Sequence, residues 1–222
     1  MLSKTEKTFS LIFLIIVIAE LVCDNIETLT TFHYLTKPLI LISLIFFFWN
    51  YGKHLDNKTR LFTFLALILS LFGDVLLMFA DASTSFFIGG LVSFLLAHIM
   101  YVFTFLKKKN NLNNTVLLTI ILLVYAAGLF YFLKDGLGDL LVPVIIYMIV
   151  ILSMVITAFL RKGSVPKSSY FFVFLGALFF ITSDSLLALN KFYEPLPFSG
   201  ISIMLTYSIA QLFIVLGIKK QQ

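Results

Sequence analysis

Asp74 and Asp184 lie inside two long apolar stretches of the chain. Asp74 belongs to the run Leu-Phe-Gly-Asp-Val-Leu-Leu-Met, and Asp184 to the run Phe-Phe-Ile-Thr-Ser-Asp-Ser-Leu-Leu-Ala. Counted from Arg60 and from Ser169, where the two apolar stretches begin, both aspartates lie roughly 21 Å along a helix. If both helices start at the same membrane surface, the carboxyl groups lie at matching depths and can meet wherever the helices are neighbours.

Two carboxyl groups in one cavity of low dielectric constant are suited to acid–base chemistry. They cannot both ionise cheaply, so one keeps a proton and the pair titrates as a unit. One acid and one base then arise from identical residues, which suits hydrolysis of an acid-labile, ether-type bond. The alternative is that each aspartate only joins helices through Ser, Thr or Tyr. In either case the cost of a charge in the bilayer, about 2.5–3.5 kcal/mol, predicts that both face the bundle interior.

Two further pairs of polar residues are each expected on one face of a helix. His98 and Tyr101 are three residues apart, and Tyr207 and Gln211 are four apart, so each pair lies on one side of a helix. His98 is either a hydrogen-bonded core histidine or part of the site. Tyr207 and Gln211 are either satisfied packing residues or substrate contacts.

Two lysines are candidates to hold a phosphate group. Lys37 precedes one apolar stretch and Lys191 follows Asp184 by seven residues, so both belong at the mouth of a site. The alternative for each is a lysine that merely extends to the membrane interface. We expect no metal ion and no cofactor, because one intramembrane histidine and two aspartates do not form a zinc-ligand pattern.

The composition predicts a polytopic helical membrane protein. Hydrophobic residues make up 60% of the 222 residues and charged residues only 12%, and the mean hydropathy is +1.06. A soluble domain would need more charged surface, and the apolar blocks are longer than β-barrel strands. The net charge of +5 does not indicate a nucleic-acid partner, because the basic residues lie at helix ends. The single cysteine, Cys23, excludes an intrachain disulfide.

Eight apolar stretches have roughly the length that a membrane span requires, and we assign all 222 residues to one transmembrane domain. The second stretch is short enough to be re-entrant, and its Pro38 is tolerable if it lies in a first helical turn. The expected spans are Thr8–Val22, Leu35–Tyr51, Arg60–Ala80, Ser85–Leu106, Thr115–Leu133, Leu140–Leu160, Ser169–Asn190 and Phe198–Ile218.

Lysine and arginine residues predict the orientation of these spans. With eight spans, 13 basic residues fall on the side of the termini and three on the other side. Such a bias marks the cytoplasmic side, and removing any one span, the second included, would destroy it. We therefore predict that both termini are cytoplasmic. The compact chain suggests a bacterial inner membrane protein.

The two halves of the chain resemble each other over short segments. Gly73-Asp74-Val75-Leu76-Leu77 aligns with Ser183-Asp184-Ser185-Leu186-Leu187 at an offset of 110 residues, and Gly90 aligns with Gly200 at the same offset. With four spans in each half, a duplication would give a parallel repeat. The alternative is coincidence between apolar segments.

Several short motifs, taken in order and spacing, are similar to those of one family across nearly the whole chain. They are Thr36-Lys37-Pro38-Leu39, Gly73-Asp74, Phe94 with His98 and Tyr101, Ser183-Asp184, Leu187 to Phe192, and Tyr207-x-x-Ala210-Gln211. Together they resemble the YhhN-like lysoplasmalogenase family. No single motif is specific, since each is short and lies in apolar sequence.

The resemblance implies an eight-span enzyme that hydrolyses the vinyl ether bond of lysoplasmalogens to a fatty aldehyde and a glycerophospho-headgroup. It assigns the two essential acids to Asp74 and Asp184, and it makes Asn190, within the matching segment, a further candidate substrate contact. The expected partners are a single-chain ether phospholipid and membrane lipids. Two alternatives remain: a proton-coupled transporter that uses the aspartates as a relay, and a small membrane scaffold.

Overall fold

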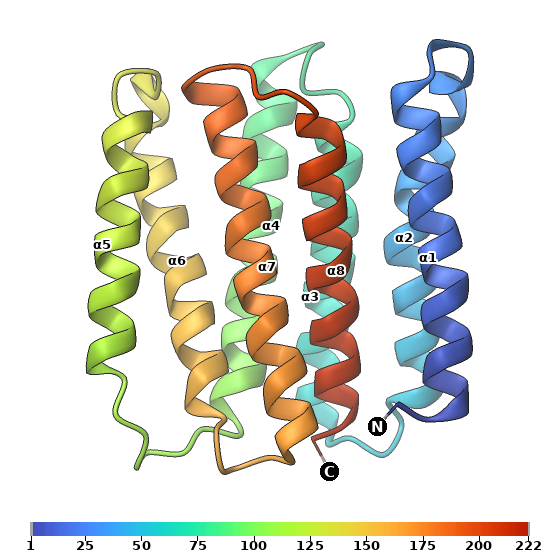
Figure 1. The fold of residues 1–222 in the computed structure, drawn as a ribbon, viewed down its shortest axis with the longest axis vertical. Helices are drawn as coiled ribbons and strands as arrows, with labels where there is room; N and C mark the ends of the chain where they lie inside the picture. Colours follow the sequence, from blue (N-terminus) through green and yellow to red (C-terminus); the bar gives the residue numbers. More distant parts are fainter. Residues whose placement is uncertain (1, 222) are drawn as a thin grey trace.

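A computed structural model describes residues 2–221 as a bundle of long helices, shown in Figure 1. Short 3-10 turns lie at Glu27–Leu29 and Gly138–Leu140. No strand occurs within the described residues, which confirms the predicted all-α fold. The helices are α1 (Lys4–Asn25), α2 (Thr30–Tyr51), α3 (Asn57–Leu77), α4 (Thr84–Leu106), α5 (Val116–Leu133), α6 (Leu141–Leu160), α7 (Lys167–Phe192) and α8 (Ser199–Lys219).

All eight helices have the length and hydropathy of membrane spans. Their most apolar 18-residue windows have mean hydropathies between 1.5 and 2.8, and 18 residues of helix are about 27 Å long, close to the thickness of a bilayer core. The prediction of eight spans is confirmed, and the chain is a multi-pass integral membrane protein. Both termini lie at one end of the bundle (Figure 1); that this end is cytoplasmic stays a prediction.

Helices α7 and α8 pack together at backbone distance. A Cβ atom at Gly176 would lie 2.9 Å from the carbonyl oxygen of Ala210, and one at Gly217 would lie 3.0 Å from that of Ser169. The Ser169 hydroxyl also donates a hydrogen bond of 2.6 Å to the carbonyl oxygen of Gly217. Small residues of this kind replace the missing hydrophobic driving force between helices in lipid.

Helices α3 and α4 form a similar pair behind α7 and α8 (Figure 1). The Ser93 hydroxyl donates to the carbonyl oxygen of Leu69 at 2.7 Å, and a Cβ atom at Gly73 would meet the Phe94 ring at 2.6 Å. Helices α5 and α6 flank these four helices on one side, and α1 and α2 on the other. The two aspartate-bearing helices, α3 and α7, therefore both belong to the central four.

Polar contacts join the helices at the end that carries the termini. The Glu6 carboxylate of α1 lies 2.8 Å from the ammonium groups of Lys219 and Lys220 at the end of α8. The buried guanidinium of Arg161 donates to Ser169 and to Gln221. The two lysines compensate the buried charge of Glu6, whereas Nε and Nη1 of Arg161 make no hydrogen bond with any described residue.

Two helix boundaries differ from the predicted spans in ways that matter for the site. Helix α2 begins at Thr30 instead of Leu35, so Pro38 lies in the helix interior and the expectation of a first-turn proline is wrong. Helix α3 ends at Leu77 instead of Ala80, which places Asp74 in its last turn. Both errors have one cause: the limits of an apolar run mark the bilayer, whereas caps and turns decide where a helix ends.

Candidate active site

Asp74 and Asp184 line the same cavity, at the end of the bundle opposite the termini. This polar cavity has a volume of about 230 Å³ and is enclosed by α2, α3, α4, α7, α8 and the turn after α3. Each aspartate lies 17 residues after the first residue of its helix, from 57 to 74 in α3 and from 167 to 184 in α7. The arrangement brings two carboxyl groups to one water-accessible space inside the membrane domain.

Asp74 is buried and is held by a chain of hydrogen bonds from α8. The Tyr207 hydroxyl donates to Asp74 Oδ2 at 2.9 Å. The Gln211 amide donates to the Tyr207 hydroxyl at 3.4 Å and to Ser70 at 3.0 Å, while its carbonyl oxygen accepts from Tyr101 at 2.7 Å. Buried networks in which each group has a partner fix side-chain positions. Tyr207 contacts the Asp74 carboxyl group directly, whereas Gln211 contacts the Tyr207 hydroxyl and Tyr101 contacts Gln211.

Asp184 has different neighbours. The Tyr147 hydroxyl of α6 donates to Asp184 Oδ2 at 2.5 Å, and His98 Nε2 of α4 lies 3.8 Å from the same oxygen. The Asp184 side chain is 16% exposed. The two identical residues therefore occupy different surroundings, which is the condition for one to serve as acid and the other as base.

His98 is completely buried, yet neither ring nitrogen forms a hydrogen bond with any described residue. Its ring packs edge-to-face on Phe180, with 4.5 Å between centroids, and on Tyr147 at 5.4 Å. The interpretation of His98 as a hydrogen-bonded core histidine is wrong for the described part of the chain. Buried polar atoms without partners are uncommon, and the Nε2 atom of His98 faces Asp184.

A second, apolar cavity of about 60 Å³ lies between α4, α5, α6 and α7. It shares Leu77, Phe87, Phe94, Asp184 and Leu187 with the polar cavity. Asp184 therefore lies at the boundary between a polar space and an apolar one. Aliphatic and aromatic side chains make up most of the remaining wall, which also contains Tyr125 and Ser185, joined by a hydrogen bond of 2.7 Å from the tyrosine hydroxyl.

Lys37 and Lys191 both line the polar cavity. The sequence predicted both at the mouth of a site. The Lys191 ammonium lies 5.2 Å from the centre of the Phe87 ring. Asn190 also lines the cavity, but its carbonyl oxygen accepts a hydrogen bond from the backbone nitrogen of Leu196 at 2.9 Å. That bond shapes the connection between α7 and α8, so Asn190 has a structural role as well.

Tyr147 is the site residue that sequence reasoning missed. It is the nearest donor to Asp184, yet it lies in the apolar run Val-Ile-Ile-Tyr-Met-Ile-Val of α6. The available signal was a hydroxyl group in the middle of an apolar span, because such a group needs a partner inside the bundle. The spacing from Asp184 gave no indication of the contact.

Comparisons with known proteins find relatives that carry one common name. The chain is 33% identical to human lysoplasmalogenase TMEM86B over 193 residues, which cover 86% of this chain and 77% of that protein. It is 30% identical to human lysoplasmalogenase TMEM86A, covering 81% and 74%. It is also 29% identical to the lysoplasmalogenase of Mycobacterium tuberculosis, covering 74% and 62%.

No solved structure matches the chain. The model of the YhhN family matches residues 32–218, which contain both aspartates and every other predicted site residue. This match extends over most of the sequence, and the chain belongs to the YhhN family.

Proposed function

We propose that the chain hydrolyses the vinyl ether bond of lysoplasmalogens with Asp74 and Asp184 as an acid–base pair, releasing a fatty aldehyde and a glycerophospho-headgroup. The observation that carries this proposal is the cavity that both aspartates line, with Asp184 at its apolar boundary. The relatives named lysoplasmalogenase, aligned over 81–86% of the chain for the two human proteins, place the chain among ether hydrolases.

The two cavities differ in polarity as the two parts of such a substrate do. The carbons of the alkenyl chain nearest the ether oxygen enter the apolar cavity of about 60 Å³ between α4 and α7, and the rest of the chain extends into the surrounding lipid. The phosphate lies in the polar cavity, near the ammonium groups of Lys37 and Lys191. The vinyl ether bond, which joins these two parts, is then located beside the carboxyl groups.

The first chemical step is proton transfer to carbon. One aspartic acid donates its proton to the β-carbon of the vinyl ether, and the double-bond electrons form the new C–H bond. The positive charge that develops is an oxocarbenium ion, which the ionised partner carboxylate stabilises. Positioned acid–base catalysis typically accelerates such a step by about 10²–10⁴-fold.

The second step consumes water. The partner carboxylate, which was ionised from the start, takes one proton from a water molecule. The water oxygen adds to the oxocarbenium carbon at the same time, which gives a hemiacetal. This carboxyl group then returns the proton to the ether oxygen of the leaving glycerol, while the other aspartate accepts the hemiacetal hydroxyl proton. The C–O bond breaks, the aldehyde and alcohol separate, and the original protonation pattern is restored.

Tyrosine hydroxyls orient both acids in this scheme. Tyr207 and Tyr147 each donate to one carboxylate oxygen, at 2.9 and 2.5 Å. The second oxygen of each group remains to exchange a proton with substrate or water. Restricting a catalytic group to a productive orientation is a large part of the advantage of an enclosed site.

The test uses the purified full chain in detergent with two lipids: a lysoplasmalogen and its saturated 1-alkyl analogue. We expect aldehyde only from the vinyl ether lipid, because the saturated ether has no carbon that an acid can protonate. Absence of aldehyde from both lipids would refute the proposal. In the same preparation reconstituted into liposomes, proton flux without aldehyde would support the transporter alternative.

A further inference from the structure

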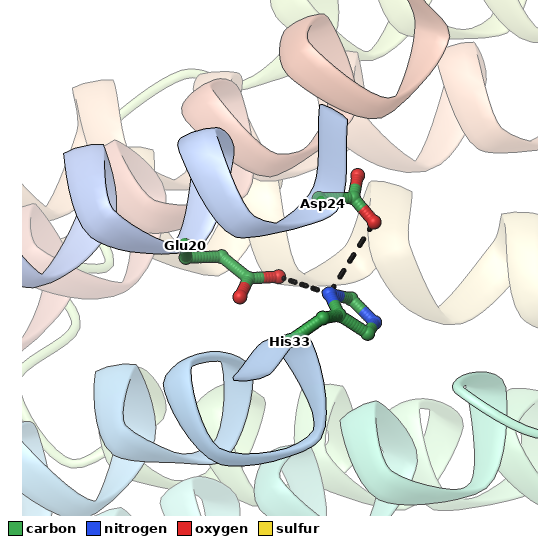
Figure 2. Close-up of side chains that lie close together, drawn as sticks. All are labelled: Glu20, Asp24 and His33. Atoms are coloured by element: carbon green, nitrogen blue, oxygen red, sulfur yellow. Dashed lines mark ion pairs between the residues drawn. The ribbon is translucent and has the colours of Figure 1, made fainter. Parts of the chain in front are cut away.

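Three potential metal ligands meet on α1 and α2 at the end of the bundle opposite the termini. Figure 2 shows His33 Nδ1 directed at two carboxylates, 2.9 Å from Glu20 Oε1 and 3.3 Å from Asp24 Oδ1. All three ligand atoms lie within 4.8 Å of one another. None of the three residues belongs to the polar cavity that contains the aspartate pair.

The sequence brings these residues together through local geometry. Glu20 and Asp24 are four residues apart and therefore share one face of α1 near its end. A short connection that includes the turn Glu27–Leu29 reverses the chain, so the first turn of α2 lies against the last turns of α1. His33 is the fourth residue of α2 and faces the two acids.

The burial of Glu20 and of the His33 Nδ1 atom is consistent with a bound ligand. Glu20 is 1% exposed, and the Thr36 hydroxyl holds its Oε2 atom at 2.5 Å while Oε1 is turned to the histidine. His33 Nδ1 is buried and makes no hydrogen bond with any described residue, although a carboxylate oxygen lies 2.9 Å away. A buried ring nitrogen that lies between two carboxylate oxygens and makes no hydrogen bond has the surroundings of a metal ligand.

The two separations from His33 Nδ1 are close to those around a small divalent cation, and the two carboxylate oxygens lie within 4.8 Å of each other. Zinc binds histidine nitrogen and carboxylate oxygen at about 2.0–2.2 Å in a tetrahedral arrangement, so two of its ligand atoms lie roughly 3.3–3.5 Å apart. The separations from His33 Nδ1, 2.9 and 3.3 Å, need only a small adjustment. Asp24 has a side chain that is 37% exposed, which leaves an entry path and room for a water molecule as the fourth ligand.

We infer that Glu20, Asp24 and His33 form a binding site for a divalent transition-metal ion of the zinc type. The ion joins the end of α1 to the start of α2. His33 lies one helical turn before Lys37, which lines the polar cavity, so the ion also fixes the turn of α2 that forms part of that wall. The alternative is a protonated His33 that bridges two carboxylates as an ordinary ion pair.

Zinc titration of the purified, tag-free full chain by calorimetry separates these alternatives. We expect one zinc ion per chain, with affinity reduced at least tenfold in His33→Gln and in Asp24→Asn. The matched control is His54→Gln, because His54 is exposed at the other end of the bundle, where its Nε2 atom lies 2.9 Å from the carbonyl oxygen of Lys219. This control should bind zinc like the unmodified chain.

Thermal unfolding supplies a second measurement. Zinc should raise the Tm of the unmodified chain and of His54→Gln, because a ligand that binds only the folded state stabilises it, and it should not raise the Tm of Asp24→Asn. Zinc binding that is absent from the unmodified chain, or unchanged in both site variants, would overturn the inference. Neither measurement requires substrate, so failure of the hydrolase proposal would leave the result unaffected.

Discussion

At the scale of single residues, the same side chain occurs twice in different surroundings. Asp74 is enclosed and linked through Tyr207 to a chain of buried hydrogen bonds, whereas Asp184 is partly exposed and lies beside Tyr147 and His98. A carboxyl group that is more open exchanges protons with substrate or water more readily. The two residues are of the same type, so the different neighbours of Asp74 and Asp184 must decide which acts as the acid and which as the base.

Replacing either aspartate by asparagine should abolish turnover. Asp74→Asn and Asp184→Asn each remove a proton donor or acceptor, and we expect kcat to fall by at least 10²-fold. The measurement is aldehyde release by each purified variant, after its Tm has shown that it is folded. Asp139→Asn, at an exposed position before α6, is the control and should retain activity. Near-normal activity in either site variant would exclude the pair.

The pH dependence of kcat/KM should be bell-shaped. Activity needs one protonated and one ionised carboxyl group, so it should fall at low pH, when both carry protons, and at high pH, when neither does. A pH–rate profile of the purified chain checks this expectation. A profile that is flat across both limbs would contradict a proton shared between the aspartates.

Tyr147 should act by positioning Asp184. In Tyr147→Phe the hydrogen bond of 2.5 Å is lost while the ring contact with His98 can persist. We expect kcat to fall about 10- to 100-fold with a much smaller change in KM, since a hydrogen bond to a charged group typically contributes about 1.5–3 kcal/mol. Tyr131→Phe, on an exposed face of α5, is the matched control. A purely structural role would lower the Tm without this selective loss of kcat.

The sequence predicted the two aspartates because acids in apolar spans are costly and therefore stand out. It did not predict Tyr147, whose partner lies 37 residues away on another helix. His33 was also missed, because it lies before the predicted second span, while Glu20 lies within the predicted first span and Asp24 just beyond its end. Contacts between helices depend on rotation about each helix axis, which a single sequence specifies only weakly.

At the scale of helices, apolar runs located all eight spans, but the helix ends required other information. Helix α2 starts five residues before its predicted span because polar residues such as His33 continue the helix beyond the apolar run. Helix α3 stops at Leu77 because turns at Phe79 and Ala80 follow it and Ser83 then caps the next helix. Such local bonds determine helix length independently of hydrophobicity.

Close contact between α7 and α8 should be sensitive to a single methyl group. In Gly176→Ala the new Cβ atom would lie 2.9 Å from a backbone oxygen and 2.8 Å from Ile214. We expect a loss of about 1–3 kcal/mol in stability, because overpacked interiors must shift backbone or side chains. Thermal unfolding in detergent measures the effect.

Gly128→Ala is the control for this experiment. A Cβ atom at Gly128, in α5, would meet no atom within 4 Å, so the added methyl group should leave the Tm unchanged or slightly raise it. Equal losses in the two variants would show that the close approach of α7 and α8 does not limit stability.

At the scale of the whole molecule, the positive-inside bias makes a prediction about orientation. In a Cys23→Ser background, Lys134→Cys and Lys109→Cys place single thiols at exposed positions on opposite ends of the bundle. A membrane-impermeant maleimide added to intact cells should label the cysteine at 134, and should label the one at 109 only after permeabilisation. The reverse pattern would show that the termini are outside.

The proposed four-plus-four repeat also belongs to this scale, and it stays a prediction. The equal helical positions of Asp74 and Asp184 are consistent with it, as are the central pairs α3–α4 and α7–α8. The two outer pairs, α1–α2 and α5–α6, flank them on opposite sides. The contrast between the surroundings of the two aspartates would then have arisen after duplication.

The position of Asp184 on the border of two cavities has a consequence for the fate of the products. Under the proposed function, cleavage converts one amphiphile into an oil-soluble fragment and a water-soluble one. The aldehyde can diffuse sideways into the bilayer while the headgroup departs to the aqueous side. Departure into two phases separates the fragments at once and leaves the site free for the next substrate, while the free energy of hydrolysis sets the direction of the reaction.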